Sequence, residues 1–275
     1  MDDGDDRSAV AQLFDRASET YEAVGVDFFA PFAGELLARI GLTEGERVLD
    51  VGCGRGAVLF PAAGAVGAAG SVLGIDLSAR MVEHTALNLG KRGVANASVV
   101  VMDAQAPDLA DASFDVVAAS FVVFFLPDPV AGLRAWHRLL RPGGRAGITT
   151  FGGDDPRWAG VRELFKPFVT PAMAWSLASR AALFASMATF DQAVESAGFT
   201  DVRSEERRVP VTFADPEQWI SWSWSHGQRM FWELVPEDRR LAVHAAVLRA
   251  LEPLREPDGS VVMSQAVRYT VARRG

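Results

Sequence analysis

The segment from Val48 to Gly56 constrains the fold of this chain most, because it combines a buried strand, an acid and a glycine turn. Its sequence is Val-Leu-Asp-Val-Gly-Cys-Gly-Arg-Gly. Glycines at three alternate positions leave no Cβ to block a close approach of the backbone, and they tolerate the positive φ values of a tight strand-to-helix turn. The segment therefore predicts the first βα unit of a parallel sheet, with a turn that holds a ligand.

The spacing of the glycines narrows the kind of ligand. It is G-x-G-x-G, whereas a nicotinamide site normally has G-x-G-x-x-G, with a helix N-terminus facing a pyrophosphate. Asp50 lies two residues before the first glycine, where its carboxylate would repel phosphate. The same carboxylate suits a ligand that carries an ammonium and a sulfonium. A nicotinamide oxidoreductase is therefore the weaker interpretation of this turn.

Four further apolar runs follow the turn, and three of them end in or near a polar residue. The first two carry the acids Asp76 and Asp103, and the third ends in Ser120. The fourth follows a Pro-Gly-Gly turn and covers 146–150. In an open α/β sheet, ligands bind beyond the carboxyl ends of the strands. The three polar side chains are thus expected at one edge of the sheet.

This order of motifs resembles the class I S-adenosylmethionine-dependent methyltransferases. Three runs are similar to the branch that methylates quinones and small natural products: Asp-Leu-Ser-Ala-Arg-Met at 76–81, Phe-Asp-Val-Val at 114–117 and Leu-Arg-Pro-Gly-Gly at 140–144. The resemblance implies an α/β fold. We expect a Rossmann-like, seven-stranded, mostly parallel sheet with helices on both faces, an antiparallel last strand and helical lid insertions.

The resemblance also implies that S-adenosylmethionine is the cofactor, and it assigns residues to each part of it. The methionine end is expected near Asp50, Gly52, Gly54 and Ser120. The ribose and adenine are expected near Asp76, Leu77, Met81, Asp103 and Ala104. Tyr21, from the N-terminal helices, would close over the cofactor.

Hydrophobic patterning outside the core suggests how the chain is divided. Residues 1–44 carry two amphipathic helical patterns and form an N-terminal helical cap. Residues 45–151 are the cofactor-binding core, and 152–189 are an aromatic lid insertion. Residues 190–275 complete the sheet, with strands near 202–211 and 261–271, and contain a helical substrate-binding insertion at 215–256.

The insertion at 215–256 carries the candidate catalytic residue. Asp215 as N-cap, Pro216 at the first helical position and Gln218 three residues after the cap predict a helix that continues through Trp232. One face of that helix would carry Trp219, Trp222, His226, Arg229 and Met230. This mixture suits the wall of a pocket, and an interfacial patch or a histidine satisfied under a lid is the alternative.

The acceptor atom is left open between oxygen and carbon. For a hydroxyl acceptor, His226 is the candidate base, because the pKa of an unperturbed imidazole lies near neutrality. For an electron-rich carbon, aromatic walls would stabilise developing positive charge. The run Ser-Phe-Val-Val-Phe-Phe at 120–125 predicts an apolar small-molecule substrate. Candidate substrate-binding residues are Phe14, Phe124, Trp175, Trp222 and Arg229.

Composition excludes several other classes of protein. The formal net charge of −8 and the lack of a basic stripe argue against a nucleic-acid partner. Residues 57–75 are uncharged, but Pro61 and several glycines make them a poor membrane span. The single cysteine, Cys53, and the acidic N-terminus favour a cytoplasmic protein. No cluster has metal-ligand spacing, so no metal is expected. A homo-oligomer, with N-terminal helices exchanged between chains, stays open.

Two further functions are compatible with the cofactor motifs. A methyltransferase-fold cyclase or pericyclase would bind the cofactor without transferring its methyl group. A protein-binding regulator would keep only a vestigial site, although the intact acids at successive strand ends argue against such decay.

Overall fold

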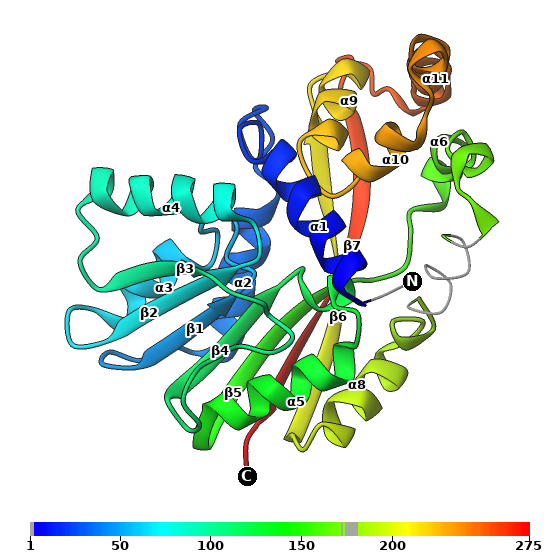
Figure 1. The fold of residues 1–275 in the computed structure, drawn as a ribbon. Coiled ribbons are helices and arrows are strands. Elements are labelled where there is room, and N and C mark those ends of the chain that lie inside the picture. The colour runs from blue at the N-terminus through cyan, green and yellow to red at the C-terminus, as the bar shows by residue number, and fades with distance from the viewer. Residues whose placement is uncertain (1–2, 172, 174–180) are drawn as a thin grey trace.

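A single seven-stranded sheet organises the computed structural model, which describes residues 3–171, 173 and 181–275 (Figure 1). The strand order is β3-β2-β1-β4-β5-β7-β6, and β7 runs in the direction opposite to the other six strands. The strands are β1 Arg47–Val51, β2 Ser71–Asp76, β3 Ala97–Val101, β4 Phe114–Ser120, β5 Leu140–Phe151, β6 Thr200–Phe213 and β7 Val261–Arg273. The predicted α/β fold, mostly parallel with an antiparallel last strand, is confirmed.

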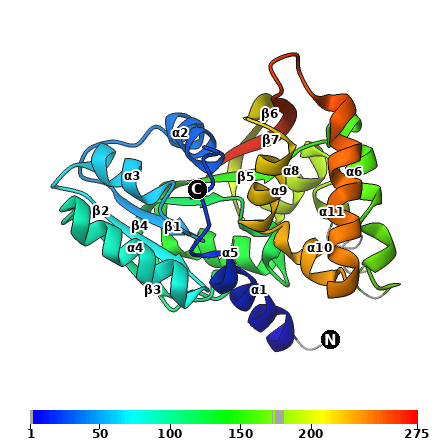
Figure 2. The same cartoon turned by 90° about the horizontal axis from the view of Figure 1, so that it is seen from above.

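Both faces of the sheet are covered by helices (Figure 2). Successive strand side chains point to opposite faces, so Val48 belongs to one hydrophobic core and Leu49 to the other. Helices α2 (Phe29–Ile40) and α3 (Leu59–Val66) contribute to the first core, and α5 (Pro129–Leu139) and α8 (Met187–Ser196) to the second. Burial on both faces explains why β1 and β4 carry adjacent apolar residues, such as Val48 and Leu49, rather than a strict alternation of apolar and polar ones.

Polar side chains cap several helices, and the cap predicted at Asp215 is among them. Helix α4 (Ala79–Arg92) begins after Ser78, whose hydroxyl accepts from the Met81 N–H at 3.1 Å. Helix α5 begins after Asp128, which caps the N–H of Ala131. Helix α9 (Pro216–Trp224) begins after Asp215, whose carboxylate accepts from the Gln218 N–H. Each cap satisfies an N–H that the first helical turn leaves without a partner.

The prediction of one helix from Asp215 through Trp232 is wrong. The chain leaves the helix after Trp224 and starts a separate helix, α10, at Arg229–Leu234. The Trp222 carbonyl oxygen accepts hydrogen bonds from the side chains of both Ser225 and His226. These side-chain bonds take the place of the backbone hydrogen bond that would continue the helix. Helix α8 begins at Met187 after the cap Ser186, so it starts within the segment predicted as the lid insertion, 152–189. The fifth strand begins at Leu140 and includes the predicted turn.

A group of helices gathers above the carboxyl ends of the central strands, beside the long projecting ends of β6 and β7 (Figure 1). It includes parts of the N-terminal segment and of both predicted insertions. Its helices are α1 Asp3–Ala17, α6 Ala159–Glu163, α9, α10 and α11 Glu237–Leu251. Short 3₁₀ turns cover Val123–Phe125, Pro156–Trp158, Lys166–Phe168 and Glu252–Leu254. Within the described ranges, no helix has both the length and the apolar character needed to cross a membrane.

Candidate functional site

The turn after β1 adopts the strained backbone that its glycines permit. Gly52, Gly54 and Gly56 have φ values of +66°, +49° and +90°. A Cβ at Gly52 would lie 2.4 Å from Cγ2 of Val122, so even the smallest side chain would displace the segment after β4. The N–H of Gly54 donates to Oδ2 of Asp76 at 2.8 Å, which joins this turn to the end of β2.

Two buried acids lie at this turn. The Asp50 side chain is 1% exposed, and its Oδ2 has no hydrogen-bond partner among the described residues. Burial, and then the nearby charge of Asp76, hold the pKa of Asp50 well above its usual value. Asp76 accepts from the N–H groups of Gly54 and Ser78, and burial raises its pKa too. A cationic ligand would offset the desolvation of both carboxylates, so the site fits a group with a sulfonium and an ammonium.

Helix α1 packs across the carboxyl ends of β1, β2 and β4, where the sequence predicts the cofactor and which we call the cofactor edge. Its contacts there were not evident from the sequence patterns. Asp15 accepts from the Ser78 hydroxyl at 2.5 Å and from the Arg80 N–H at 3.1 Å. Arg7 forms an ion pair with Asp103 at 3.0 Å. Arg7 and Asp15 look like ordinary surface charges of an amphipathic helix in the sequence, so no local signal identifies their partners.

Two adjoining cavities lie beneath α1. The smaller is lined by six of the predicted cofactor residues, Tyr21, Gly52, Gly54, Asp76, Met81 and Ser120. The larger has a volume of about 770 Å³, within the usual range for small-molecule sites. Both cavities share the side chains of Phe14, Tyr21, Phe121 and Phe125. A ligand in one cavity would therefore meet a ligand in the other across these rings.

The other four predicted cofactor residues lie outside the lining of the smaller cavity. Asp50 lies buried below the glycine turn, and Leu77 directly follows Asp76. Asp103 is paired with Arg7 and also accepts from the backbone N–H of Gln105. Ala104 is buried, and its carbonyl accepts from the indole of Trp136 at 2.7 Å.

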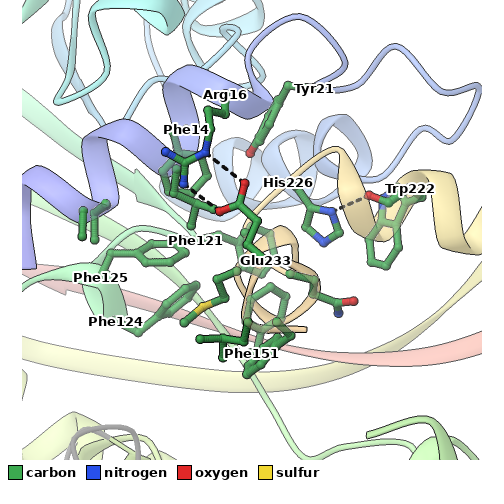
Figure 3. A pocket seen from close by; sticks show the side chains of 18 of the residues that line it. Phe14, Arg16, Tyr21, Phe121, Phe124, Phe125, Phe151, Trp222, His226 and Glu233 are labelled. Carbon is green, nitrogen blue, oxygen red and sulfur yellow. Dashed lines mark hydrogen bonds and ion pairs between the residues drawn. The ribbon is translucent and has the colours of Figure 1, made fainter. Parts of the chain in front are cut away.

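Aromatic side chains dominate the larger cavity (Figure 3). Of the predicted substrate residues, Phe14, Phe124 and Trp222 line it. Arg229 lies behind its wall, because its guanidinium donates to Glu233, which does line it. Trp175 lies outside the described residues. Phe121 and Phe125, from the run that predicts an apolar substrate, also line it, and the other aromatic lining residues are Tyr21, Phe28, Phe29, Phe151, Phe184 and Phe231.

Phe121 has a backbone conformation that is rare for a bulky residue. Its φ is +56°, and its N–H donates to both Oγ1 and the carbonyl oxygen of Thr149, at 3.0 and 3.2 Å. Its ring stacks on Phe151 with centroids 4.7 Å apart. These contacts hold the Phe121 ring between the two cavities. Strained backbone conformations of this kind cluster at functional sites.

The imidazole of His226 lies in the wall of the larger cavity with one nitrogen already bonded. Its Nδ1 is 2.7 Å from the Trp222 carbonyl oxygen, which can only accept, so Nδ1 carries the proton. Nε2 is then left with its lone pair. Burial lowers the pKa of His226 to about 4, so the ring is neutral at pH 7. His226 therefore offers a hydrogen-bond acceptor inside an apolar cavity that adjoins the cofactor edge.

Comparisons with known proteins agree with this geometry. Residues 48–144 match the methyltransferase domain family. The chain is 38% identical to the nocamycin O-methyltransferase of Saccharothrix syringae over 275 residues, which cover 95% of this chain and 97% of that protein. It is 45% identical to the aklanonic acid methyltransferase DauC of Streptomyces sp. (strain C5) over 150 residues, 54% of this chain and 68% of that protein.

A solved structure supports the fold in the same way. The YcgJ protein from Bacillus subtilis has a TM-score of 0.61 at 15% identity, and the match covers 88% of this chain and 97% of that one. At this identity the likeness concerns the fold alone. The full-length relationship at 38% identity decides the family and excludes the nicotinamide interpretation. The chain belongs to the class I S-adenosylmethionine-dependent methyltransferases, in the branch that acts on natural products.

Proposed function

We propose that this methyltransferase transfers a methyl group to an oxygen atom of an apolar small molecule of secondary metabolism. The observation that carries the proposal is the neutral His226 ring, whose free Nε2 lies in an aromatic cavity that adjoins the cofactor edge. The full-length relative named as an O-methyltransferase supports oxygen as the acceptor.

The residues around the glycine turn hold the cofactor in this proposal. S-adenosylmethionine supplies an electrophilic methyl group when bound. Asp76 accepts from the ribose hydroxyls, Asp50 offsets positive charge beneath Gly52 and Gly54, and Ser120 contacts the amino group. Leu77, Met81, Asp103 and Ala104 surround the adenine, and Tyr21 covers the methionine end. The strand residues are supported by their place at the carboxyl edge of the sheet, and Met81 and Tyr21 by their place in the lining of the smaller cavity.

His226 binds and deprotonates the acceptor hydroxyl in this proposal. The Trp222 carbonyl fixes the tautomer, so Nε2 is available without a change of protonation. Because the pKa of His226 is about 4, this base suits the more acidic hydroxyls, such as a phenol or an enol, whereas a carboxylate acceptor needs no base. The surrounding rings exclude water and hold the acceptor in line, and such positioning supplies up to about 7–11 kcal/mol of barrier reduction in well-oriented systems.

Labelled cofactor tests the choice of acceptor atom. The purified protein is incubated with carbon-13-methyl S-adenosylmethionine and a panel of phenols, enols and aromatic acids, and products are analysed by mass and carbon-13 spectra. We expect a product heavier by one methyl group with a methoxyl or methyl ester carbon. A C-methyl signal contradicts the proposal, and a rearranged product of unchanged mass supports the cyclase alternative.

A matched variant tests the role of His226. His226→Gln keeps an N–H donor for the Trp222 carbonyl but lacks a basic nitrogen. We expect turnover to fall about 100-fold, the usual range for loss of a general base. Calorimetry with S-adenosylhomocysteine should give unchanged affinity in the same variant, which separates chemistry from cofactor binding.

The proposal also includes a cytoplasmic location, and it leaves a homo-oligomer to be tested. A cytoplasmic protein fits the single buried thiol of Cys53, which carries no disulfide. A homo-oligomer with exchanged N-terminal helices requires that α1 make its contacts with the α4 of a second chain, and light scattering of the purified protein tests whether an oligomer forms.

A further inference from the structure

A charged cluster at the edge of the aromatic cavity is unexplained by methyl transfer. Arg16 from α1 and Glu233 from α10 are the charged side chains among the described lining residues, given that His226 is neutral. Nε and Nη2 of Arg16 donate to the two carboxylate oxygens of Glu233, at 2.9 and 2.7 Å. Figure 3 shows this bidentate pair facing the aromatic rings.

A second arginine, Arg229, also forms an ion pair with Glu233. Nε of Arg229 donates to Oε1 of Glu233 at 2.7 Å from the neighbouring turn of α10. Burial opposes ionisation of Glu233, but the hydrogen bonds from Arg16 and Arg229 outweigh it and lower the pKa of this carboxyl. The three groups are therefore all charged, and their sum is one positive charge. That excess stands out in a chain whose formal net charge is −8.

The geometry allows Arg16 to be released without leaving Glu233 unpaired. The Arg16 side chain is 46% exposed, whereas Arg229 is 22% exposed and spans a single helical turn to Glu233. A guanidinium binds two oxygens of a carboxylate in a planar fork, which is the arrangement that Glu233 occupies here. An external oxyanion can therefore take the place of Glu233 on Arg16 while Arg229 keeps Glu233 paired.

We propose that Arg16 is an anion receptor at the edge of the cavity, so that the substrate is an apolar molecule bearing a carboxylate or similar oxyanion beside its aromatic or aliphatic skeleton. This inference rests on the proposed function and adds the charge of the substrate to it. Arg16 binds the oxyanion of the substrate, and the aromatic side chains of the cavity bind its apolar skeleton. Arg229 stays paired with Glu233. The local positive charge also attracts an acid that the whole chain would otherwise repel.

Two dyes that differ by one anionic group test the inference without knowledge of the substrate. Anilinonaphthalene sulfonate is an apolar anion, and N-phenylnaphthylamine is the same skeleton without the sulfonate. Dissociation constants are measured by fluorescence for the wild type, Arg16→Met and Glu233→Gln. Arg80→Met is the matched control, because Arg80 forms a comparable ion pair with Glu83 on the exposed face of α4.

The expected result is selective for the anionic dye. Arg16→Met should weaken binding of the sulfonate about tenfold, as for loss of one charge-assisted contact, and leave the neutral dye within about twofold. Glu233→Gln should strengthen sulfonate binding, and Arg80→Met should change neither. Unchanged sulfonate affinity in Arg16→Met overturns the inference.

A second comparison covers the case in which Arg16→Met weakens both dyes. Glu233→Gln then decides: tighter sulfonate binding with unchanged neutral binding supports the receptor, and unchanged sulfonate binding overturns it. Failure of the inference leaves S-adenosylhomocysteine binding and methyl transfer intact. Failure of methyl transfer, in contrast, leaves the dye selectivity intact, so the two can be told apart.

Discussion

Protonation of His226 should make the protein lose stability in acid in a calculable way. The pKa of His226 is about 4 in the folded protein, whereas the imidazole of an unfolded chain has a pKa of about 6.5. The unfolded state therefore binds the proton first, so the free energy of unfolding falls as the pH drops from about 6.5 towards 4. The full difference is about 3.4 kcal/mol, and linkage gives a loss of about 2 kcal/mol at pH 5.

Urea unfolding between pH 7.5 and 4.5 measures this loss when the wild type is compared with His226→Gln. Asp50, Asp76 and the other carboxyls titrate in both proteins, so their contributions cancel in the difference. The variant should be less stable than the wild type at pH 7.5, and the gap should narrow by about 2 kcal/mol by pH 5. His84→Gln, outside the cavity, should follow the wild type. A constant gap across this range would refute the assignment of His226 as a buried neutral acceptor.

Three further predictions concern the cofactor edge and the core. Gly52→Ala should weaken S-adenosylhomocysteine binding about tenfold or more in calorimetry, because its Cβ would lie 2.4 Å from a valine methyl; Gly90→Ala, with open space, should bind normally. Asp76→Ala should weaken the same binding about 100-fold while the circular dichroism spectrum is retained; near-normal affinity would contradict its role. Glu46→Gln, which breaks a buried pair with an arginine, should cost about 2–3 kcal/mol in urea unfolding, against less than about 0.5 for the exposed Glu83→Gln.

The central sheet could be predicted from the sequence because its signals are local. Strands β1 to β4 each contain a short apolar run, and residues such as Asp76 and Ser120 mark the strand ends. Parallel order then brings those ends to one edge, which is why six predicted cofactor residues line one cavity. The capping residues Ser78, Asp128 and Asp215 are also local signals, and each accepts a hydrogen bond from the first turn of the helix that follows it.

The helices above the sheet could be predicted less well, because side-chain bonds and distant partners decide their geometry. The break after Trp224 depends on Ser225 and His226 sharing one carbonyl, which outweighs helical periodicity. Arg229 has the right sequence spacing for a pocket wall, yet Glu233 holds it behind that wall. The pairs Arg16–Glu233 and Arg7–Asp103 join residues far apart in the chain, and no single-sequence pattern encodes such partners.

Three consecutive residues near the end of α1 connect the two cavities. Successive side chains of a helix point about 100° apart, so one turn can contact three different neighbours. Phe14 lies in the wall of both cavities, Asp15 bonds the first turn of α4 at the cofactor edge, and Arg16 pairs with Glu233 of α10. Displacement of this turn would move a wall that both cavities share. We therefore expect exchange of the cofactor and of the substrate to be coupled through α1, and a substrate acid that takes Arg16 from Glu233 would act on the same helical turn.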